Sequence, residues 1–174
     1  MKFDEIWKDY YQRLSVYCRK SFGLSEDDTE DMVQEILLKV YKNRAAYSKK
    51  YSFSTWIYTV ARNTCIDFLR KIQNFHTTGF EEEKIVQFPD RKTPPPEDAA
   101  ADNELRTYIA DFIEGLSSED RELVHLKMYE ELPYREIAAI IGLPEGTAKY
   151  RIHAIRKQLR QFLGETYEKK SIYN

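Results

Sequence analysis

Residues 133–160 read PYREIAAIIGLPEGTAKYRIHAIRKQLR. They predict a short helix, a tight turn at Gly142-Leu143-Pro144 and a second helix rich in basic side chains, which is the layout of a helix-turn-helix. In the second helix the apolar side chains recur at steps of four, three and four residues, as one face of an α-helix does: Ala148, Ile152, Ile155 and Leu159. That face would be buried and the opposite face could enter a DNA major groove, although an ordinary amphipathic surface helix has the same pattern.

The polar side of the second helix supplies candidate DNA contacts. Side chains opposite the apolar face are expected to reach bases or the backbone: Tyr150, His153 and Lys157. Side chains on its flanks are expected to hold phosphates: Arg151, Arg156 and Arg160. Thr147 and Lys149 in the first turn complete the set.

Composition indicates a chain of one ordinary domain or two small ones. The 174 residues are 42% hydrophobic and 32% charged, and no stretch approaches the roughly 18 consecutive apolar residues of a membrane span. The start of the sequence is acidic, unlike a signal peptide, and Cys18 and Cys65 fall in helical patterns that favour buried free thiols. These features predict a cytoplasmic protein without membrane insertion.

The sequence offers no support for an enzyme. His76, His125 and His153 have no metal-ligand spacing around them, and no phosphate-cradling glycine motif or nucleophile elbow is present. We therefore expect neither catalysis nor a bound metal or cofactor.

The net charge of −2 conceals separate blocks of opposite sign. Residues 25–35 carry six acids and no base, residues 42–71 carry seven bases and one acid, and residues 81–104 carry eight acids and three bases. The distribution indicates an acidic surface for a basic protein partner and basic surfaces for nucleic acid, although solvated surface would also account for it.

Helical periodicity without strand alternation predicts an all-α fold of two small domains. Residues 1–72 would form the first domain and residues 105–164 the second, joined by a flexible, acidic, proline-containing linker at 73–104 and followed by a tail at 165–174. Serines are expected at the starts of three helices: Ser25, Ser54 and Ser117. The helix from Ser54 should bury one face: Ile57, Val60, Ala61, Thr64, Phe68 and Ile72.

Three segments resemble parts of one known family, the bacterial RNA polymerase sigma factors. Residues 27–41, DDTEDMVQEILLKVY, resemble their polymerase-binding helix, and residues 53–70, FSTWIYTVARNTCIDFLR, resemble their promoter-melting, minus-10-reading segment. Residues 116–149 resemble the domain that reads the minus-35 element. Size, order and linker are similar to the extracytoplasmic-function (ECF) group of the sigma-70 family, which keeps only these two domains.

The resemblance implies that Asp31, Gln34 and Glu35 bind core RNA polymerase, at the clamp helices of its largest subunit. The three lie within little more than one helical turn, where they could pair with basic residues of a partner helix. Capping of the helix N-terminus would explain Asp27 and Asp28 well, but Gln34 and Glu35 less well.

The resemblance also implies a minus-10 surface that reads and opens DNA and holds a displaced base near the 47–53 loop. Aromatic faces can stack on bases, a flipped base needs a pocket, and an amide can read a base edge. Trp56 could equally belong to the core, and Arg62 could instead form a structural ion pair with Asp67. The implied set is Tyr47, Lys49, Lys50, Tyr51, Phe53, Trp56, Arg62 and Asn63.

The sequence is thus interpreted as a sigma factor that directs core RNA polymerase to promoter DNA, and the resemblance implies that an anti-sigma factor holds it inactive. The acidic linker would lie along the polymerase interior and mimic nucleic acid. An autonomous helix-turn-helix transcriptional regulator is the alternative, as is a sigma-like adaptor without promoter activity. Tyr150 and Ala154 depart from the residues common in the family, which leaves the minus-35 sequence open.

Overall fold

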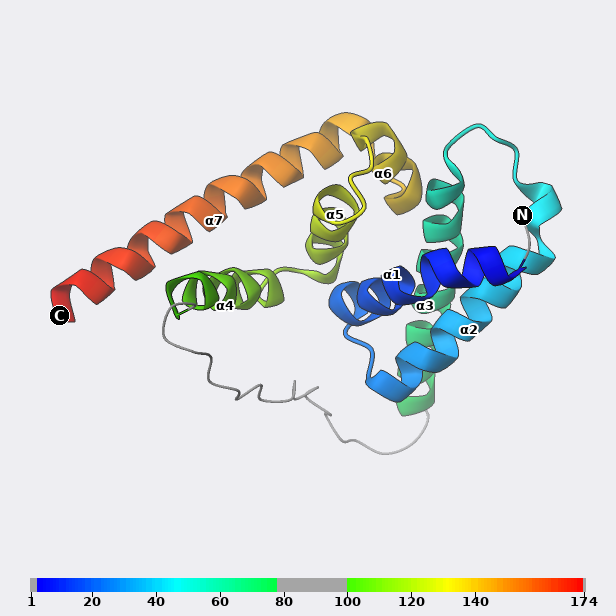
Figure 1. The fold of residues 1–174 in the computed structure, drawn as a ribbon, viewed down its shortest axis with the longest axis horizontal. Helices are drawn as coiled ribbons and strands as arrows, with labels where there is room; N and C mark the ends of the chain where they lie inside the picture. The colour runs from blue at the N-terminus through cyan, green and yellow to red at the C-terminus, as the bar shows by residue number, and fades with distance from the viewer. Residues whose placement is uncertain (1–2, 78–99, 174) are drawn as a thin grey trace.

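The computed structural model describes residues 3–77 and 100–173, and all regular structure within these ranges is helical (Figure 1). This confirms the predicted all-α class. The elements are α1 (Phe3–Phe22), α2 (Glu26–Lys42), the 3-10 turn η1 (Arg44–Ala46), α3 (Phe53–Thr77), α4 (Ala100–Glu114), α5 (Ser118–Met128), α6 (Tyr134–Ile141) and α7 (Glu145–Tyr173). None of the described helices is long and apolar enough to cross a membrane.

The first three helices pack against one another around the apolar face of α2. Ser25 caps α2 as predicted, because its Oγ accepts a hydrogen bond from the Asp28 backbone N–H at 3.1 Å. The apolar stripe of α2 is buried: Met32, Val33, Ile36, Leu37 and Val40. The opposite face of α2 is thereby left to solvent.

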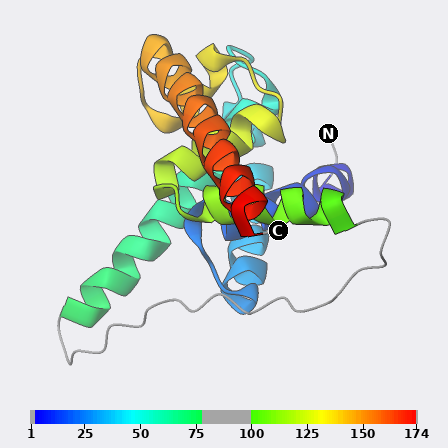
Figure 2. The same ribbon diagram turned by 90° about the vertical axis from the view of Figure 1, so that its left-hand side faces the viewer.

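The predicted start of the third helix is wrong by two residues. Ser52, and not Ser54, caps α3, because the Ser52 Oγ accepts a hydrogen bond from the Thr55 N–H at 3.2 Å. Ser54 lies inside the helix, and its hydroxyl is 2.8 Å from the Tyr10 hydroxyl of α1. The predicted inward face of α3 holds for its first half, but Ile72 is exposed because the second half of α3 extends beyond the packed core (Figure 2).

The helix-turn-helix forms as predicted, with α6 as its first helix and α7 as its second. Gly142 ends α6 in the left-handed region (φ 80°), and its N–H and that of Leu143 both donate to the Ala138 carbonyl. Gly142 suits this position because a side chain there would be strained. Ser117 caps α5 as predicted, with its Oγ 3.2 Å from the Asp120 N–H.

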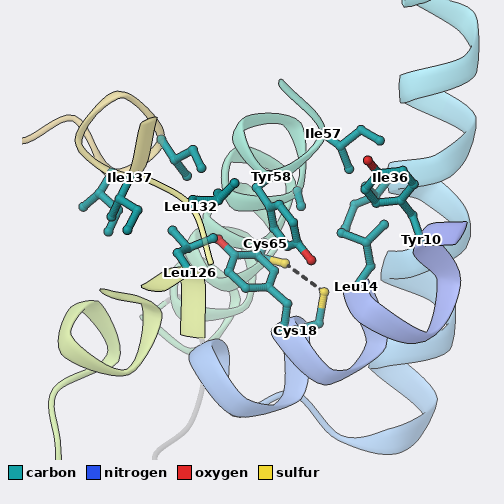
Figure 3. Packing of buried hydrophobic residues seen from close by; sticks show 14 of the residues in the cluster. Tyr10, Leu14, Cys18, Ile36, Ile57, Tyr58, Cys65, Leu126, Leu132 and Ile137 are labelled. Atoms are coloured by element: carbon teal, nitrogen blue, oxygen red, sulfur yellow. Dashed lines mark hydrogen bonds between the residues drawn. The ribbon is translucent and has the colours of Figure 1, made fainter. Parts of the chain in front are cut away.

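The two halves share one continuous core. Helix α1 packs against α5, and α3 packs against α6, so Leu126 and Ile137 of the second half join the same cluster as Tyr58 of the first (Figure 3). Cys18 and Cys65 lie in this core as buried free thiols with their Sγ atoms 3.6 Å apart, as predicted. The predicted acidic linker lies mostly outside the described residues. Helix α3 reaches Thr77 and α4 begins at Ala100, each inside the predicted linker range.

Candidate protein and nucleic-acid interfaces

The acidic face of α2 is open to solvent. Asp31, Gln34 and Glu35 are all exposed, since the buried stripe of the same helix points the other way. Glu35 pairs with Lys39 one turn further on (2.6 Å). Both line a hollow of about 250 Å³ between α2 and α3.

Leu38 belongs to the same face and was missed in the sequence. It follows Asp31 by two helical turns, and 46% of its surface is exposed. An exposed apolar side chain ringed by polar groups is typical of the centre of a protein–protein contact. The sequence held a signal: Leu37 already completes the buried stripe, so Leu38 must point elsewhere.

Three of the predicted minus-10 residues form one aromatic cluster where η1 and the following loop meet the start of α3. The ring centroid of Tyr47 lies 5.2 Å from that of Phe53 and 5.8 Å from that of Trp56, and the ring centroids of Phe53 and Trp56 are 5.5 Å apart. All three are half-buried, so each ring contributes to packing and keeps a surface for a ligand. The Tyr47 hydroxyl donates to the Tyr51 carbonyl at 2.8 Å, which holds the loop closed on itself.

A cavity of about 410 Å³ opens beside this cluster. It is lined by Ile6, Arg44, Ala45, Tyr47 and Phe53, which combine apolar and aromatic walls with one cation. A flat apolar group with a polar edge, such as a base, suits such walls.

The other minus-10 candidates lie outside this cluster. Lys49, Lys50 and Asn63 are exposed, and the Lys50 ammonium lies 5.4 Å from the ring centroid of the half-buried Tyr51. Arg62 is separate from them, because its side chain points to the C-terminal half and is only 17% exposed.

Arg62 pairs with Glu122 of α5, and the predicted Arg62–Asp67 ion pair is wrong. Its Nε lies 3.2 Å from Glu122 Oε2, and the Tyr17 hydroxyl donates to Glu122 Oε1 at 2.5 Å. Asp67 instead accepts from Arg70 at 3.1 Å. Burial raises the pKa of Glu122, while Tyr17 and Arg62 act against that rise.

A second carboxylate of the C-terminal half, Glu130 in the loop after α5, has a lowered pKa, in contrast to Glu122. Arg13 of α1 donates to it, with Nε at 3.0 Å, and the buried His125 Nε2 is 3.6 Å away. Burial acts to raise the pKa of Glu130, but interactions with His125, Arg13 and Tyr58 outweigh it and lower the pKa to about 2.

Because its pKa is lowered in the folded protein, Glu130 is expected to make the free energy of unfolding fall in acid. A carboxyl whose pKa is lower in the folded protein stabilises the fold above its unfolded value of 4.5, and this contribution is lost as the pH falls towards about 2. We expect the native chain to lose up to about 3 kcal/mol more than Glu130→Gln between pH 5 and pH 2. Urea unfolding of both proteins across this range measures the difference, and parallel curves would contradict the assignment.

The candidate minus-35 residues lie on α7, which Figure 1 shows from the side along its whole length. Seven of the eight are exposed, with Tyr150 at 73%: Thr147, Lys149, Tyr150, His153, Arg156, Lys157 and Arg160. Arg151 differs, because it is half-buried and pairs with Glu119 (2.8 Å) and Asp120 (2.7 Å) at the start of α5.

These features define a helical DNA-binding protein that joins a helix-turn-helix to a second surface with aromatic side chains and a cavity. The family profile for Sigma-70 region 2 matches residues 6–75, and that for Sigma-70, region 4 matches residues 106–159. The chain is 32% identical to the ECF RNA polymerase sigma factor SigW of Bacillus subtilis, over 91% of this chain and 89% of the relative. It is 31% identical to the ECF RNA polymerase sigma factor SigL of Mycobacterium tuberculosis, over 90% and 87%.

The chain belongs to the ECF group of the sigma-70 family of RNA polymerase sigma factors. Two solved structures share its fold. The sigma factor RpoE from Bartonella quintana, in complex with the anti-sigma factor NepR, has a TM-score of 0.67 and 22% identity, with 93% of this chain and 96% of that chain covered. CnrH in complex with the cytosolic domain of CnrY has a TM-score of 0.62 and 21% identity, with 94% and 88% covered. Nothing in these matches favours an autonomous regulator.

Proposed function

We propose that this chain directs core RNA polymerase to promoters and opens the DNA there. The acidic face of α2 binds the polymerase, the aromatic cluster and α3 read and hold the melted minus-10 element, and α7 reads the minus-35 element. The polymerase carries out the chemistry, and the chain itself transfers no group. It acts in the cytoplasm, where the polymerase works.

The aromatic cluster with its cavity carries this proposal. Opening a duplex requires that a base leave its stack, and aromatic faces return about 1–3 kcal/mol per stacked base. The rings of Tyr47, Phe53 and Trp56 form one cluster, and Tyr47 and Phe53 line a cavity of about 410 Å³ with Arg44 in its wall. A helix-turn-helix regulator that binds only duplex DNA needs no such pocket.

The helix-turn-helix itself needs only modest affinity. Because the polymerase would hold both halves of the chain on one promoter, the second contact gains effective concentration from the first. The exposed Tyr150, His153 and Lys157 are proposed to meet bases or the backbone, and Arg156 and Arg160 to hold phosphates. Arg151 is proposed to fix the angle of α7 through its pairs with α5.

Run-off transcription tests the function. Purified core polymerase is given DNA fragments from the source genome with and without the protein. We expect transcripts with defined 5′ ends only when the protein is present. If no fragment yields such a transcript, the proposed function is wrong.

An anti-sigma factor is proposed as a further partner. One structure of the same fold is a complex with the anti-sigma factor NepR. Co-purification of the tagged protein from its source cells, with identification of bound proteins by mass spectrometry, tests this partner.

Leu38 is expected to contribute to polymerase binding. We expect Leu38→Ser to weaken binding to core polymerase by about tenfold, because an apolar side chain buried at the centre of an interface contributes roughly 1–2 kcal/mol. Fluorescence anisotropy of the labelled protein with core polymerase measures the affinity. Ile72→Ser is the matched control, since Ile72 is also exposed (36%) but lies outside the acidic face of α2. Equal affinities for the Leu38 variant and the native chain would exclude this role.

A further inference from the structure

The two cysteines of the chain, Cys18 of α1 and Cys65 of α3, lie against each other. They are 47 positions apart in the sequence, yet their Sγ atoms are 3.6 Å apart and share a hydrogen bond (Figure 3). Neither side chain is exposed to solvent. Because the S–S bond of a disulfide is about 2.05 Å long, an approach of about 1.5 Å by the two sulfurs would allow one covalent bond to join the helices.

The surroundings of the pair keep both thiols reduced under ordinary conditions. The hydrogen bond with Cys18, together with burial, raises the pKa of the Cys65 thiol. The thiolate is the form that reacts with oxidants, so a buried and protonated thiol reacts slowly. Oxidation therefore requires a local opening of the helices that brings one sulfur into contact with the oxidant.

A bond between the two cysteines would close a loop that contains the residues proposed to act in transcription. The loop includes all of α2, which packs against both α1 and α3, so the bond would link the two helices that support α2. The sulfurs are buried, whereas the acidic face of α2 is exposed, so the bond would leave that face unchanged. The functional candidates inside the loop are Asp31, Gln34, Glu35, Leu38, Tyr47, Phe53 and Trp56.

We propose that Cys18 and Cys65 form a redox modification site. Hydroperoxides convert the two thiols to a disulfide, which links α1 to α3 and protects this part of the chain from unfolding without covering its binding surfaces. The roles of polymerase binding and base capture rest on the proposed function above, whereas the bond itself does not. Dithiol reductants reverse the modification by thiol–disulfide exchange.

The oxidation takes place in two steps. After local opening, the thiolate of one cysteine attacks an oxygen of the hydroperoxide; an S–O bond forms, the O–O bond breaks, and the other oxygen takes up a proton and leaves as water or an alcohol. The sulfur of the second cysteine then attacks the sulfenic acid; the S–S bond forms, the S–O bond breaks, and the hydroxyl leaves as water with the proton of the second thiol. The two sulfurs together lose two electrons, which reduce one hydroperoxide.

The position of the second thiol favours the disulfide over further oxidation, because the folded chain holds it beside the first. The disulfide stabilises the fold by restricting the unfolded chain. For a loop of 47 residues, loop-closure entropy predicts an unfolding equilibrium constant lower by about 1,000-fold and a Tm higher by about 10 °C.

Mass spectrometry and thermal unfolding test the site without polymerase or promoter. The full chain is incubated with hydrogen peroxide in native buffer, and the remaining thiols are alkylated. We expect both alkylation sites to be lost, a linked Cys18–Cys65 peptide to appear, and the Tm to rise by about 10 °C until dithiothreitol reverses it. Cys18→Ala and Cys65→Ala are the matched controls, since each keeps a single thiol and peroxide should not raise its Tm.

Two results would overturn the site. One is a linked peptide that forms only after urea has unfolded the chain, because the native fold would then not bring the sulfurs together for reaction. The other is an oxidised chain whose Tm equals or lies below that of the reduced chain, because the bond would then give no protection. Non-reducing electrophoresis verifies that the bond lies within one chain.

Proteolysis and polymerase binding test the protection. At a urea concentration that half unfolds the reduced chain, we expect a protease to cleave the oxidised chain at least about tenfold more slowly, since cleavage follows the unfolded population. Fluorescence anisotropy should give the oxidised and reduced chains equal affinities for core polymerase. Weaker binding by the oxidised chain alone would refute the protective role. If neither form binds polymerase although the bond forms and raises the Tm, the proposed function is wrong and the redox site stands.

Discussion

Asp31→Arg is expected to weaken binding to core RNA polymerase by at least about 30-fold and to abolish run-off transcription at low protein concentration. Asp31 is exposed on α2 beside Gln34 and Glu35, and an acidic face of this kind pairs with basic residues of a partner. Removing one partner of a buried interfacial charge pair costs about 2–5 kcal/mol, and reversing its sign adds repulsion. Fluorescence anisotropy with labelled protein measures the affinity.

The control is Asp111→Arg, the same change at an exposed position of α4 in the other half of the chain. It alters the net charge equally, so it separates a local contact from general electrostatic attraction. Circular dichroism verifies that both variants remain helical. Native-like transcription by Asp31→Arg would show that the polymerase binds elsewhere.

Tyr47→Ala is expected to slow promoter opening by about 5- to 150-fold, which corresponds to the loss of one stacked base. Tyr47 packs on Phe53 and Trp56 and forms part of the cavity wall. Its removal deprives a captured base of one ring and loosens the other two. Permanganate reactivity of unpaired thymines, followed over time with polymerase present, measures the opening.

Tyr47→Phe distinguishes the contribution of the ring from that of the hydroxyl. The phenylalanine keeps the stacking surface and loses only the hydrogen bond to the Tyr51 carbonyl, so we expect a much smaller effect. A template with a mismatched, already open minus-10 region should reduce the defect of Tyr47→Ala, because the base no longer has to leave a stack. An equal defect in both variants would assign the role to the hydroxyl and not to base capture.

Helix caps and helix ends were predicted correctly from the sequence in all but one case. Ser25 and Ser117 cap helices, and Gly142 ends α6, because each of these features depends on hydrogen bonds within about five residues. The buried stripe of α7 follows from helical period alone, and three of its four predicted members are buried: Ala148, Ile152 and Ile155. The one misplaced cap, Ser54, stands two residues from another serine with equal capping ability.

Contacts between residues far apart in the chain could not be predicted from the sequence. Arg62 had an acid five positions away at Asp67, yet it pairs with Glu122, 60 positions away, because the packing of α3 against the other half decides where its side chain can reach. Arg151 was assigned to phosphates from its place on the helix, whereas the start of α5 supplies it with Glu119 and Asp120.

The sequence by itself determined the all-α class, the helix-turn-helix, the order of the three segments and the family, because period, caps and motifs are local properties of the chain. Only the tertiary structure decided how the two halves meet and which proposed DNA contacts are thereby occupied. Charged side chains on different helices find their partners through the packing of apolar faces, and no spacing in the sequence encodes that arrangement. The contacts of Glu122, Glu130 and Glu136 with side chains of the N-terminal half result from that packing.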